Sequence, residues 1–249
     1  MSLKWMPRLM VLIFGFAILG NGNTTANAEL GNQTTGAAGS YSSSANQRQQ
    51  PADPEDCESL ETCYNKAQMQ QFFDQIIIYI EDFNAATFEP AIPRPNYYFV
   101  ATGQSGPTGC RDSQGTVAYD STAYFYCPPD RAIYIGQDEL WSFYGGHGDA
   151  AAAIAIAHEW GHHSQNMTGV QLADLAQENQ ADCISGAWYG YMMQRGITEP
   201  DDIDDVAAIL IAIGQVESAD DPTRKHGTTE ERVSAFGQGM NNGLRGCAP

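Results

Sequence analysis

The sequence predicts an α+β fold, with a small sheet in the first half of the chain and helices through nearly all of the second half. Three short runs of aromatic and β-branched residues, bounded by Gly, Pro and Asp, indicate strands at 97–101, 123–127 and 132–135. Beyond residue 149 the chain instead shows an Ala-rich run and apolar residues at helical spacing. The two periodicities therefore divide the chain into a mixed half and a helical half.

The first 28 residues have the composition of a secretory signal. Lys4 and Arg8 precede an apolar run over 9–19. Ala26-Asn27-Ala28 is the small-x-small pattern after which signal peptidase cleaves. The run is well short of the roughly 20 residues that a membrane-spanning helix needs, so no stable membrane span is expected. The sequence therefore predicts cleavage after Ala28 and a secreted or periplasmic protein.

A polar segment separates this signal from the folded part. Residues 29–56 are mainly Gly, Ser, Asn, Gln and Thr with almost no large apolar side chain. Such a segment cannot bury enough surface to offset the entropy lost on ordering, so we expect a disordered linker. Residues 57–249 are then sufficient for a single domain with a sizeable core.

The chain is strongly acidic, with a formal net charge of −18 at pH 7. Residues 1–28 carry two positive charges and no acidic ones, so their removal gives −18 − 2 = −20. Nucleic-acid binding requires a basic surface, and no nucleic-acid partner is expected. The charge favours solubility outside the cell and identifies no substrate.

Six cysteines in an exported chain indicate disulfides, because the compartment beyond the membrane is oxidising. Two cysteines can close one small loop, two flank a predicted hairpin, and the last two pair by elimination. The favoured pairs are Cys57–Cys63, Cys110–Cys127 and Cys183–Cys247. The alternative, a Cys-ligated zinc site, needs short C-x-x-C spacings that the sequence lacks.

The helices can be placed in order along residues 57–249. The first runs from Lys66 to about Phe83, and the prolines that begin at Pro90 prevent its continuation. Asp149, after a Gly-rich stretch, is the expected N-cap of a helix that continues to about Gln165. Further helical patterns cover 171–193, 202–216 and 229–240.

The motif His158-Glu159-Trp160-Gly161-His162 lies on the helix that follows Asp149. Residues four apart project from one face of a helix, so the two imidazoles can bind the same ion, and neutral imidazole suits Zn²⁺. Glu159 lies at the neighbouring edge of that face. There it can accept a proton from a water molecule held by the metal, as a general base.

A catalytic zinc takes three protein ligands and leaves a fourth position to water, so another ligand must come from elsewhere. Glu178 is the candidate, 178 − 162 = 16 positions after the second histidine, which allows the chain to return as a second helix. Asp182 lies on the same face and can accept the free N–H of a ligand histidine. The alternative is a buried helix whose histidines pair with local carboxylates.

Further motifs accompany this one in a set order from about residue 97 to the C-terminus. They are Tyr126-Cys127-Pro128-Pro129-Asp130, Ile133-Tyr134-Ile135, Ala157 to His163, Gln165, Glu178-Asn179-Gln180-Ala181-Asp182-Cys183, Gly186, His226-Gly227-Thr228, Arg232, Phe236 and Gly239. In these residues the sequence resembles the bacterial neutral zinc metallopeptidases, a family similar in its site to gluzincin peptidases such as thermolysin.

The resemblance implies a zincin-like domain in which His158, His162 and Glu178 bind zinc. It implies that Glu159 is the catalytic base and that Asp182 supports a ligand histidine.

The resemblance also points to His226, because gluzincins stabilise the oxyanion of the reaction with a His or Tyr supplied from a later helix. The alternatives for His226 are that it caps the following helix or pairs with Asp220 or Asp221.

Four other residues near these motifs have structural interpretations. His163 is turned about 100° from His162 around the helix, and we expect a surface group or one that supports a ligand. His147 is expected in a Gly-rich loop. Tyr126 and Tyr134 are expected to be aromatic residues of the core or of the cleft rim.

The predicted function is hydrolysis of peptide bonds in a peptide or protein substrate, with zinc polarising the scissile carbonyl. The alternative is a zinc-binding but non-proteolytic secreted interaction module, and a third interpretation is hydrolysis of another amide or an ester. Glu159 favours an enzyme, since a protein that has lost activity often loses its base while keeping its ligands.

Overall fold

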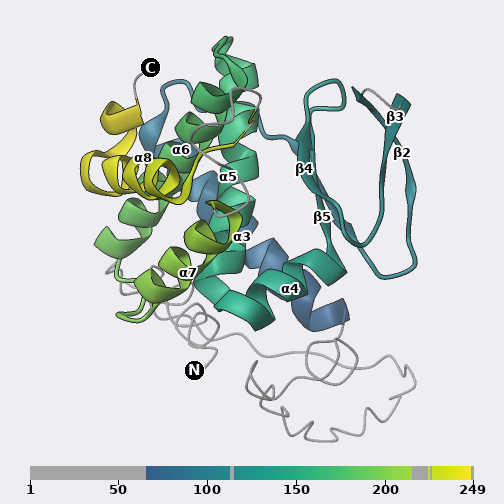
Figure 1. Cartoon of the computed structure of the whole chain (residues 1–249), viewed down its shortest axis with the longest axis horizontal. Helices are drawn as coiled ribbons and strands as arrows, with labels where there is room; N and C mark the ends of the chain where they lie inside the picture. Colours follow the sequence, from purple (N-terminus) through teal and green to yellow (C-terminus); the bar gives the residue numbers. More distant parts are fainter. Residues whose placement is uncertain (1–65, 113–114, 215–223, 225, 248–249) are drawn as a thin grey trace, which may run out of the picture.

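The computed structural model describes residues 66–112, 115–214, 224 and 226–247. The predicted signal segment 1–28, the linker 29–56 and the pair Cys57–Cys63 lie outside these residues. In the described part, most helices gather on one side and two small sheets lie on the other (Figure 1). This arrangement confirms the α+β class.

Five strands form the two sheets. β1 (Asn96–Val100), β5 (Ala132–Gly136) and β4 (Tyr124–Cys127) form a three-stranded sheet in that order, with β1 parallel and β4 antiparallel to β5. β2 (Gly106–Asp112) and β3 (Gly115–Tyr119) form a separate antiparallel pair. All of β5 is buried, as expected of a strand covered on both faces, and β4 is an edge strand of its sheet.

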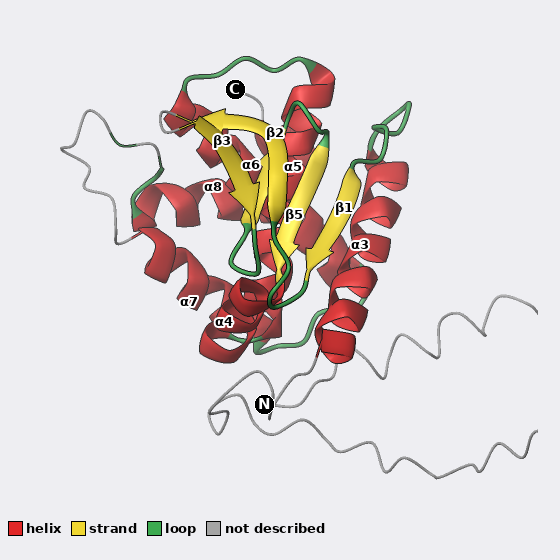
Figure 2. Cartoon of the chain, turned by 90° about the vertical axis from the view of Figure 1, so that its right-hand side faces the viewer, coloured by secondary structure: helices red, strands yellow, loops and turns green. Residues whose placement is uncertain are grey.

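The helices fill the rest of the described chain. They are α3 (Lys66–Thr87), α4 (Gln137–His147), α5 (Asp149–Thr168), α6 (Asp174–Gln194), α7 (Asp202–Gly214) and α8 (Thr229–Asn242), followed by the 3₁₀ turn η2 (Gly243–Cys247). Figure 2 shows α3 beside β1, with α5 and α6 behind the strands and α4 below them. None of the described helices combines the length and the apolar composition needed to span a bilayer.

Several sequence predictions are wrong in detail. A hairpin is predicted between Cys110 and Cys127, but the Gly-rich and polar sequence indicates no strand bounds for β2 and β3. No pattern predicts α4, which contains Gly145 and Gly146 in its last turn. α4 forms because Leu140 and Tyr144 are buried in the core, which outweighs the low helix propensity of glycine. His147 is therefore the last residue of a helix and not a loop residue.

The helix that carries the H-E-x-x-H motif, α5, begins differently from the prediction. Its N-cap is Gly148, and Asp149 is the first helical residue. The Asp149 carboxylate accepts a hydrogen bond from the adjacent Ala150 N–H at 2.9 Å, so it does not cap the helix. The buried N-terminal half of α5 then crosses the core, where Trp160 packs edge-on against Phe83 of α3 with ring centroids 6.0 Å apart.

Two of the predicted disulfides lie in the described residues and are confirmed. Cys110–Cys127 joins β2 to β4 with a Cα–Cα distance of 5.7 Å, and so connects the two sheets. Cys183–Cys247 joins α6 to η2 with a Cα–Cα distance of 5.4 Å. The C-terminal turn is therefore tied to the middle of α6.

Helices α6 and α8 pack with their main chains almost in contact. A Cβ added at Gly186 of α6 would meet the main-chain oxygen of Phe236, and one added at Gly239 of α8 would meet that of Cys183. Neither position can accept even a methyl group unless the helices separate. Gly237, two residues before Gly239, has no atom within 4 Å of such a Cβ.

Gly239→Ala should therefore lower the free energy of unfolding by about 1–3 kcal/mol, because the methyl group overpacks the interface. Gly237→Ala on the same helix should raise it by about 0.5–1 kcal/mol, because alanine is the better helix former. Urea denaturation of both variants measures the two changes. Equal effects would show that the α6–α8 contact is looser than the structure indicates.

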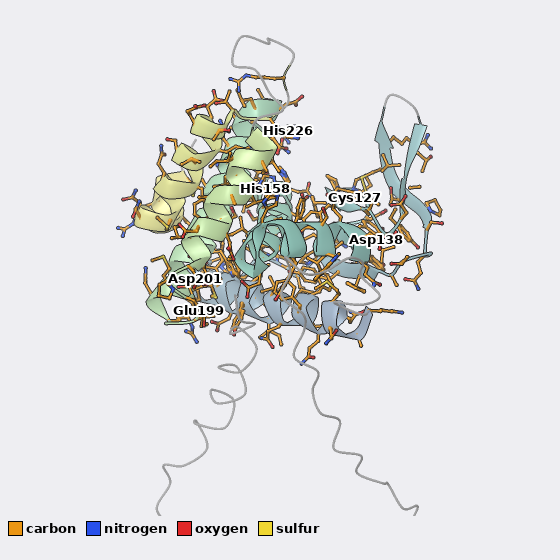
Figure 3. All side chains as sticks on the ribbon, turned by 60° about the horizontal axis from the view of Figure 1, so that its bottom comes forward. Cys127, Asp138, His158, Glu199, Asp201 and His226 are labelled. Atoms are coloured by element: carbon orange, nitrogen blue, oxygen red, sulfur yellow. A yellow bond between two sulfur atoms is a disulfide. The ribbon has the colours of Figure 1, made fainter. Side chains whose placement is uncertain are left out.

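Three carboxylates meet where α5 and α7 begin. The carboxylate oxygens of Asp149, Asp202 and Asp205 lie within 4.8 Å of one another. Burial, followed by repulsion from the neighbouring carboxylates, raises the pKa of Asp149 to about 7 and that of Asp205 to about 6. Asp201, which precedes Asp202, lies far from His158 in Figure 3, so this cluster is remote from that histidine.

The raised pKa of Asp149 gives stability a defined pH dependence. As pH rises, the unfolded chain releases this proton near its ordinary pKa of 3.8, and the folded protein releases it only near pH 7. Stability is thus lost between about pH 4 and pH 7. Asp149→Asn removes this titration. Its free energy of unfolding, relative to that of the wild type, should therefore rise by about 1–3 kcal/mol as the pH increases from about 4 to about 7. Urea denaturation at stepped pH tests this, and parallel profiles would contradict it.

Candidate metal centre

Two helices bring the donor atoms of the centre together. α5 carries His158, Glu159 and His162, and α6 crosses it with Glu178. The crossing is close because Gly161 lies at the contact, where an added Cβ would be 3.1 Å from the Ala181 Cα. The lack of a side chain at Gly161 therefore allows α6 to approach the two histidines.

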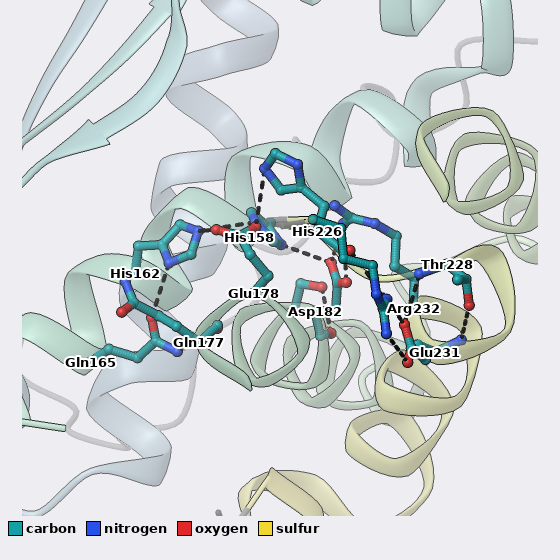
Figure 4. A network of polar contacts seen from close by, with 12 residues as sticks. His158, His162, Gln165, Gln177, Glu178, Asp182, His226, Thr228, Glu231 and Arg232 are labelled. Carbon is teal, nitrogen blue, oxygen red and sulfur yellow. Dashed lines mark hydrogen bonds and ion pairs between the residues drawn. The ribbon is translucent and has the colours of Figure 1, made fainter. Parts of the chain in front are cut away.

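The three predicted ligands converge on one point, as Figure 4 shows. The Nε2 atoms of His158 and His162 lie 3.1 Å apart. The Glu178 carboxylate lies 3.3 Å from each of them, with Oε2 next to His158 and Oε1 next to His162. Two groups of donors in the described residues are close enough to share a metal ion, and of these the present one contains histidines whereas the other is the Asp149–Asp202–Asp205 cluster.

The outer nitrogen of each imidazole is engaged by an acceptor. His158 Nδ1 lies 2.8 Å from Asp182 Oδ1, and this carboxylate also accepts hydrogen bonds from Arg232 Nη1 at 3.1 and 3.2 Å. His162 Nδ1 lies 2.9 Å from Gln165 Oε1. Both Nδ1 atoms must therefore donate, which leaves a lone pair on the Nε2 of each imidazole in its neutral form, the form that binds a metal.

Two lone pairs that face each other at 3.1 Å repel unless a cation lies between them. Zinc bonds of about 2.0–2.1 Å at tetrahedral angles place neighbouring ligand atoms roughly 3.3 Å apart. The three separations in this centre are 3.1, 3.3 and 3.3 Å. The donor set therefore fits a zinc ion in both chemistry and spacing.

The electrostatics of the centre also favour a positive charge. Burial lowers the pKa of His158, but Asp182 and Glu178 raise it by more, so the net pKa lies well above its ordinary value. Burial raises the pKa of Glu178, and its contacts with the two histidines lower it further than burial raises it. Both groups thus favour a cation among them.

Glu159 lies beside the ligands and not among them. Its Oε2 accepts a hydrogen bond from the Tyr126 main-chain N–H of β4 at 2.7 Å, which holds the carboxylate between α5 and the edge of the sheet. Burial raises its pKa, although the two ligand histidines partly offset the effect. A carboxylate with a raised pKa is a stronger proton acceptor, as a general base requires.

His226 reaches the centre from the segment before α8. Its Nε2 lies 3.9 Å from Glu178 Oε2, and its side chain is about 45% exposed. The His226 main-chain oxygen accepts a hydrogen bond from Arg224, whose guanidinium also pairs with Glu231. The N-cap of α8 is Thr228, so the interpretation of His226 as a helix cap is wrong. Asp220 and Asp221 lie outside the described residues.

The remaining histidine near the motif belongs to the core. His163 is 1% exposed, and its two ring nitrogens lie 3.1 Å from Tyr126 Oη and 2.7 Å from the Pro93 main-chain oxygen. The expectation of a surface group is therefore wrong, because α5 is covered by β4 and the loop of Pro93 on that side. Tyr126 and Tyr134 are buried, as expected of core aromatics.

Sequence reasoning missed the functions of Gln165 and Arg232. Gln165 lies three residues after His162 on the same helix, so its helical spacing could have revealed it as a partner. Arg232 lies 50 residues from Asp182 and meets it only through the packing of α8 on α6. No local pattern predicts such a contact.

The chain is similar to curated proteins from two bacterial groups. It is 32% identical over 162 residues to the uncharacterized protein YpfJ of Escherichia coli K12, covering 55% of each chain. It is 29% identical over 234 residues to the uncharacterized protein Rv2575 of Mycobacterium tuberculosis H37Rv, covering 78% of each chain. The chain thus spans about half the length of the E. coli relative. No solved structure matches it significantly.

A family model described as "Putative neutral zinc metallopeptidase" matches residues 30–247, which include every residue of the candidate metal centre. The chain therefore belongs to the family of putative neutral zinc metallopeptidases.

Proposed function

We propose that the protein is a zinc-dependent peptidase that hydrolyses peptide bonds in a peptide or protein substrate. The observation that carries this proposal is the convergence of two imidazole lone pairs and the Glu178 carboxylate, with the Glu159 carboxylate beside them. His158, His162 and Glu178 would hold the zinc, and three protein ligands leave one position for water and substrate.

Each residue of the centre has a distinct function in this proposal. A bound zinc supplies a Lewis acid that polarises a carbonyl and acidifies water. Glu159 accepts the proton of the attacking water at its carboxylate and returns it to the leaving amine. Asp182 and Gln165 keep the two ligand imidazoles in the tautomer whose Nε2 can bind the metal.

The position of β4 supports an extended peptide as the substrate. β4 is an edge strand, and its Tyr126 N–H points to Glu159. A peptide that pairs with such an edge uses main-chain hydrogen bonds, which suit many sequences. It would pass directly beside the proposed base. Hydrolysis of an ester or another amide would use the same zinc and Glu159, and substrate assays distinguish it from peptidase activity.

We also propose that the protein is exported from the cytoplasm. The disulfides Cys110–Cys127 and Cys183–Cys247 are characteristic of an oxidising compartment, which supports a secreted or periplasmic location.

Removing a proposed zinc ligand and removing the proposed base should have different effects on zinc content and on activity. Glu178→Ala should lose zinc, because two histidines alone bind it weakly. Glu159→Gln should keep zinc and lower the rate of casein cleavage by about 10²–10⁴-fold, because no base accepts the proton. Glu230→Ala, an exposed glutamate on α8, should change neither property. Metal content by mass spectrometry and casein digestion on the same samples measure these effects.

Two results would contradict the proposal in different ways. If the wild type binds zinc and cleaves no peptide library, the protein is a non-proteolytic zinc-binding module. If the wild type binds no zinc, the assignment of the metal centre is wrong.

We also propose that His226 donates a hydrogen bond from its imidazole to the oxyanion that forms during hydrolysis; its Nε2 lies 3.9 Å from Glu178 Oε2, which supports this role. His226→Phe should therefore lower kcat by about 10²–10³-fold while zinc content and KM change little. His147→Phe, at the end of α4, is the matched control and should keep full activity. Steady-state kinetics on a fluorogenic peptide test this, and an unchanged kcat in His226→Phe would exclude His226 from the reaction.

A further inference from the structure

The hydrogen bond to His162 continues into a chain of amide groups that reaches the C-terminal disulfide. Gln165 Nε2 donates to Gln180 Oε1 at 3.0 Å, and Gln180 Nε2 donates to the main-chain oxygen of Cys247 at 3.0 Å. We propose that Gln180 and the disulfide-bonded Cys247 position His162 for metal binding, by holding the Gln165 amide in the orientation that accepts its N–H. This inference rests on the proposed zinc site.

The orientation matters because a glutamine amide can rotate by 180° and exchange its oxygen with its nitrogen. A rotated Gln165 amide would present N–H to His162 Nδ1, which would then have to accept. The proton of the neutral imidazole would move to Nε2, where it would block the metal. Gln165 must therefore be held with Oε1 toward His162.

Two main-chain carbonyls prevent the rotation. Gln165 Nε2 also donates to the Gln177 carbonyl at 2.7 Å, and Gln180 Nε2 donates to the Cys247 carbonyl. A carbonyl oxygen accepts and never donates, so reversing either amide would place two oxygens against each other. The direction of every hydrogen bond from Cys247 to His162 is thereby determined.

Water cannot replace these contacts at the inner end of the chain. Gln165 is 3% exposed, so an unsatisfied amide group there would carry the full cost of desolvation. The hydrogen bond that Gln165 donates to Gln180 therefore adds to the one it donates to the Gln177 carbonyl in keeping the Gln165 amide in place, and Gln180 in turn depends on the position of Cys247.

The disulfide determines where the Cys247 carbonyl lies. It bonds Cys247 to Cys183 of α6, which is three residues after Gln180 and one residue after Asp182. One covalent bond thus holds the C-terminal turn against the part of α6 that carries Glu178, Gln180 and Asp182. Without it, η2 could move away from α6 and take the acceptor of Gln180 with it.

Gln180→Met tests the inference, because methionine has a similar length and neither accepts nor donates strongly. We expect its zinc dissociation constant, measured by chelator competition on the mature protein, to rise about 10-fold, at the low end for partners of metal ligands. Gln180→Glu keeps an acceptor for Gln165 but loses the donor to the Cys247 carbonyl, and it should restore part of the affinity. Gln194→Met, exposed at the end of the same helix, is the matched control and should bind as the wild type does.

The tautomer of His162 supplies a readout that a purely structural role would not change. In the metal-free protein, ¹⁵N chemical shifts of the imidazole should show the Nδ1–H form in the wild type and in Gln180→Glu, and a mixture of forms in Gln180→Met. Cys183→Ala with Cys247→Ala should weaken zinc binding, and adding Gln180→Met should cause little further loss, because both changes act through the same contact.

The outcomes separate this inference from the proposed function. If the wild type binds zinc and Gln180→Met binds it equally well with an unchanged tautomer, Gln180 does not position His162 and only this inference fails. Equal losses in Gln180→Met and Gln180→Glu would assign Gln180 to holding the C-terminal turn, which also overturns it. A wild type that binds no zinc would refute the zinc site itself.

Discussion

The close packing of α6 against both α5 and α8 determines where the groups of the metal centre lie. Gly161 allows α6 to approach α5, and Gly186 with Gly239 allows α8 to approach α6 with almost no side chain between them. Because the main chains are already in contact, α6 cannot shift without separating its carboxylates from the histidines of α5. The glycines of this interface are therefore as important for the centre as the residues that would bind the ion.

Packing brings the donor atoms together, and the direction of the surrounding hydrogen bonds leaves them able to bind a metal ion. Asp182 accepts a hydrogen bond from His158, and its ion pair with Arg232 holds the carboxylate in position. Gln165 performs the same function for His162 without a charge, since its Nε2 donates to the Gln177 carbonyl and its Oε1 is thereby turned toward His162. The sheet contributes through one strand, because Tyr126 of β4 holds Glu159 by its main chain and contacts His163 by its side chain.

The fold was predictable wherever a local pattern indicates it. Ile76 and Ile80 of α3, like His158 and His162 of α5, lie at helical spacing, and the strand segments alternate or are uniformly apolar. The bounds of β2 and β3 and the helix α4 were not predictable, because the disulfide of Cys110 and the burial of Leu140 and Tyr144 stabilise segments whose own sequences favour loops. The start of α5 was misplaced by one residue, because Gly148 takes the N-cap position with a φ of 100° and Asp149 is already helical.

The sequence by itself determined which chemical groups are available and which of them share a helix face. The four-residue spacing of His158 and His162, and that of Glu178 and Asp182, follows from the pitch of the α-helix and needs no tertiary information. Only the tertiary structure decided that Asp182 supports His158 and that Arg232 reaches Asp182. It also decided that His163 is buried and that the Cys247 carbonyl accepts a hydrogen bond from Gln180. These contacts join residues that are distant in the chain, and their geometry depends on how closely whole helices pack, which no local pattern specifies.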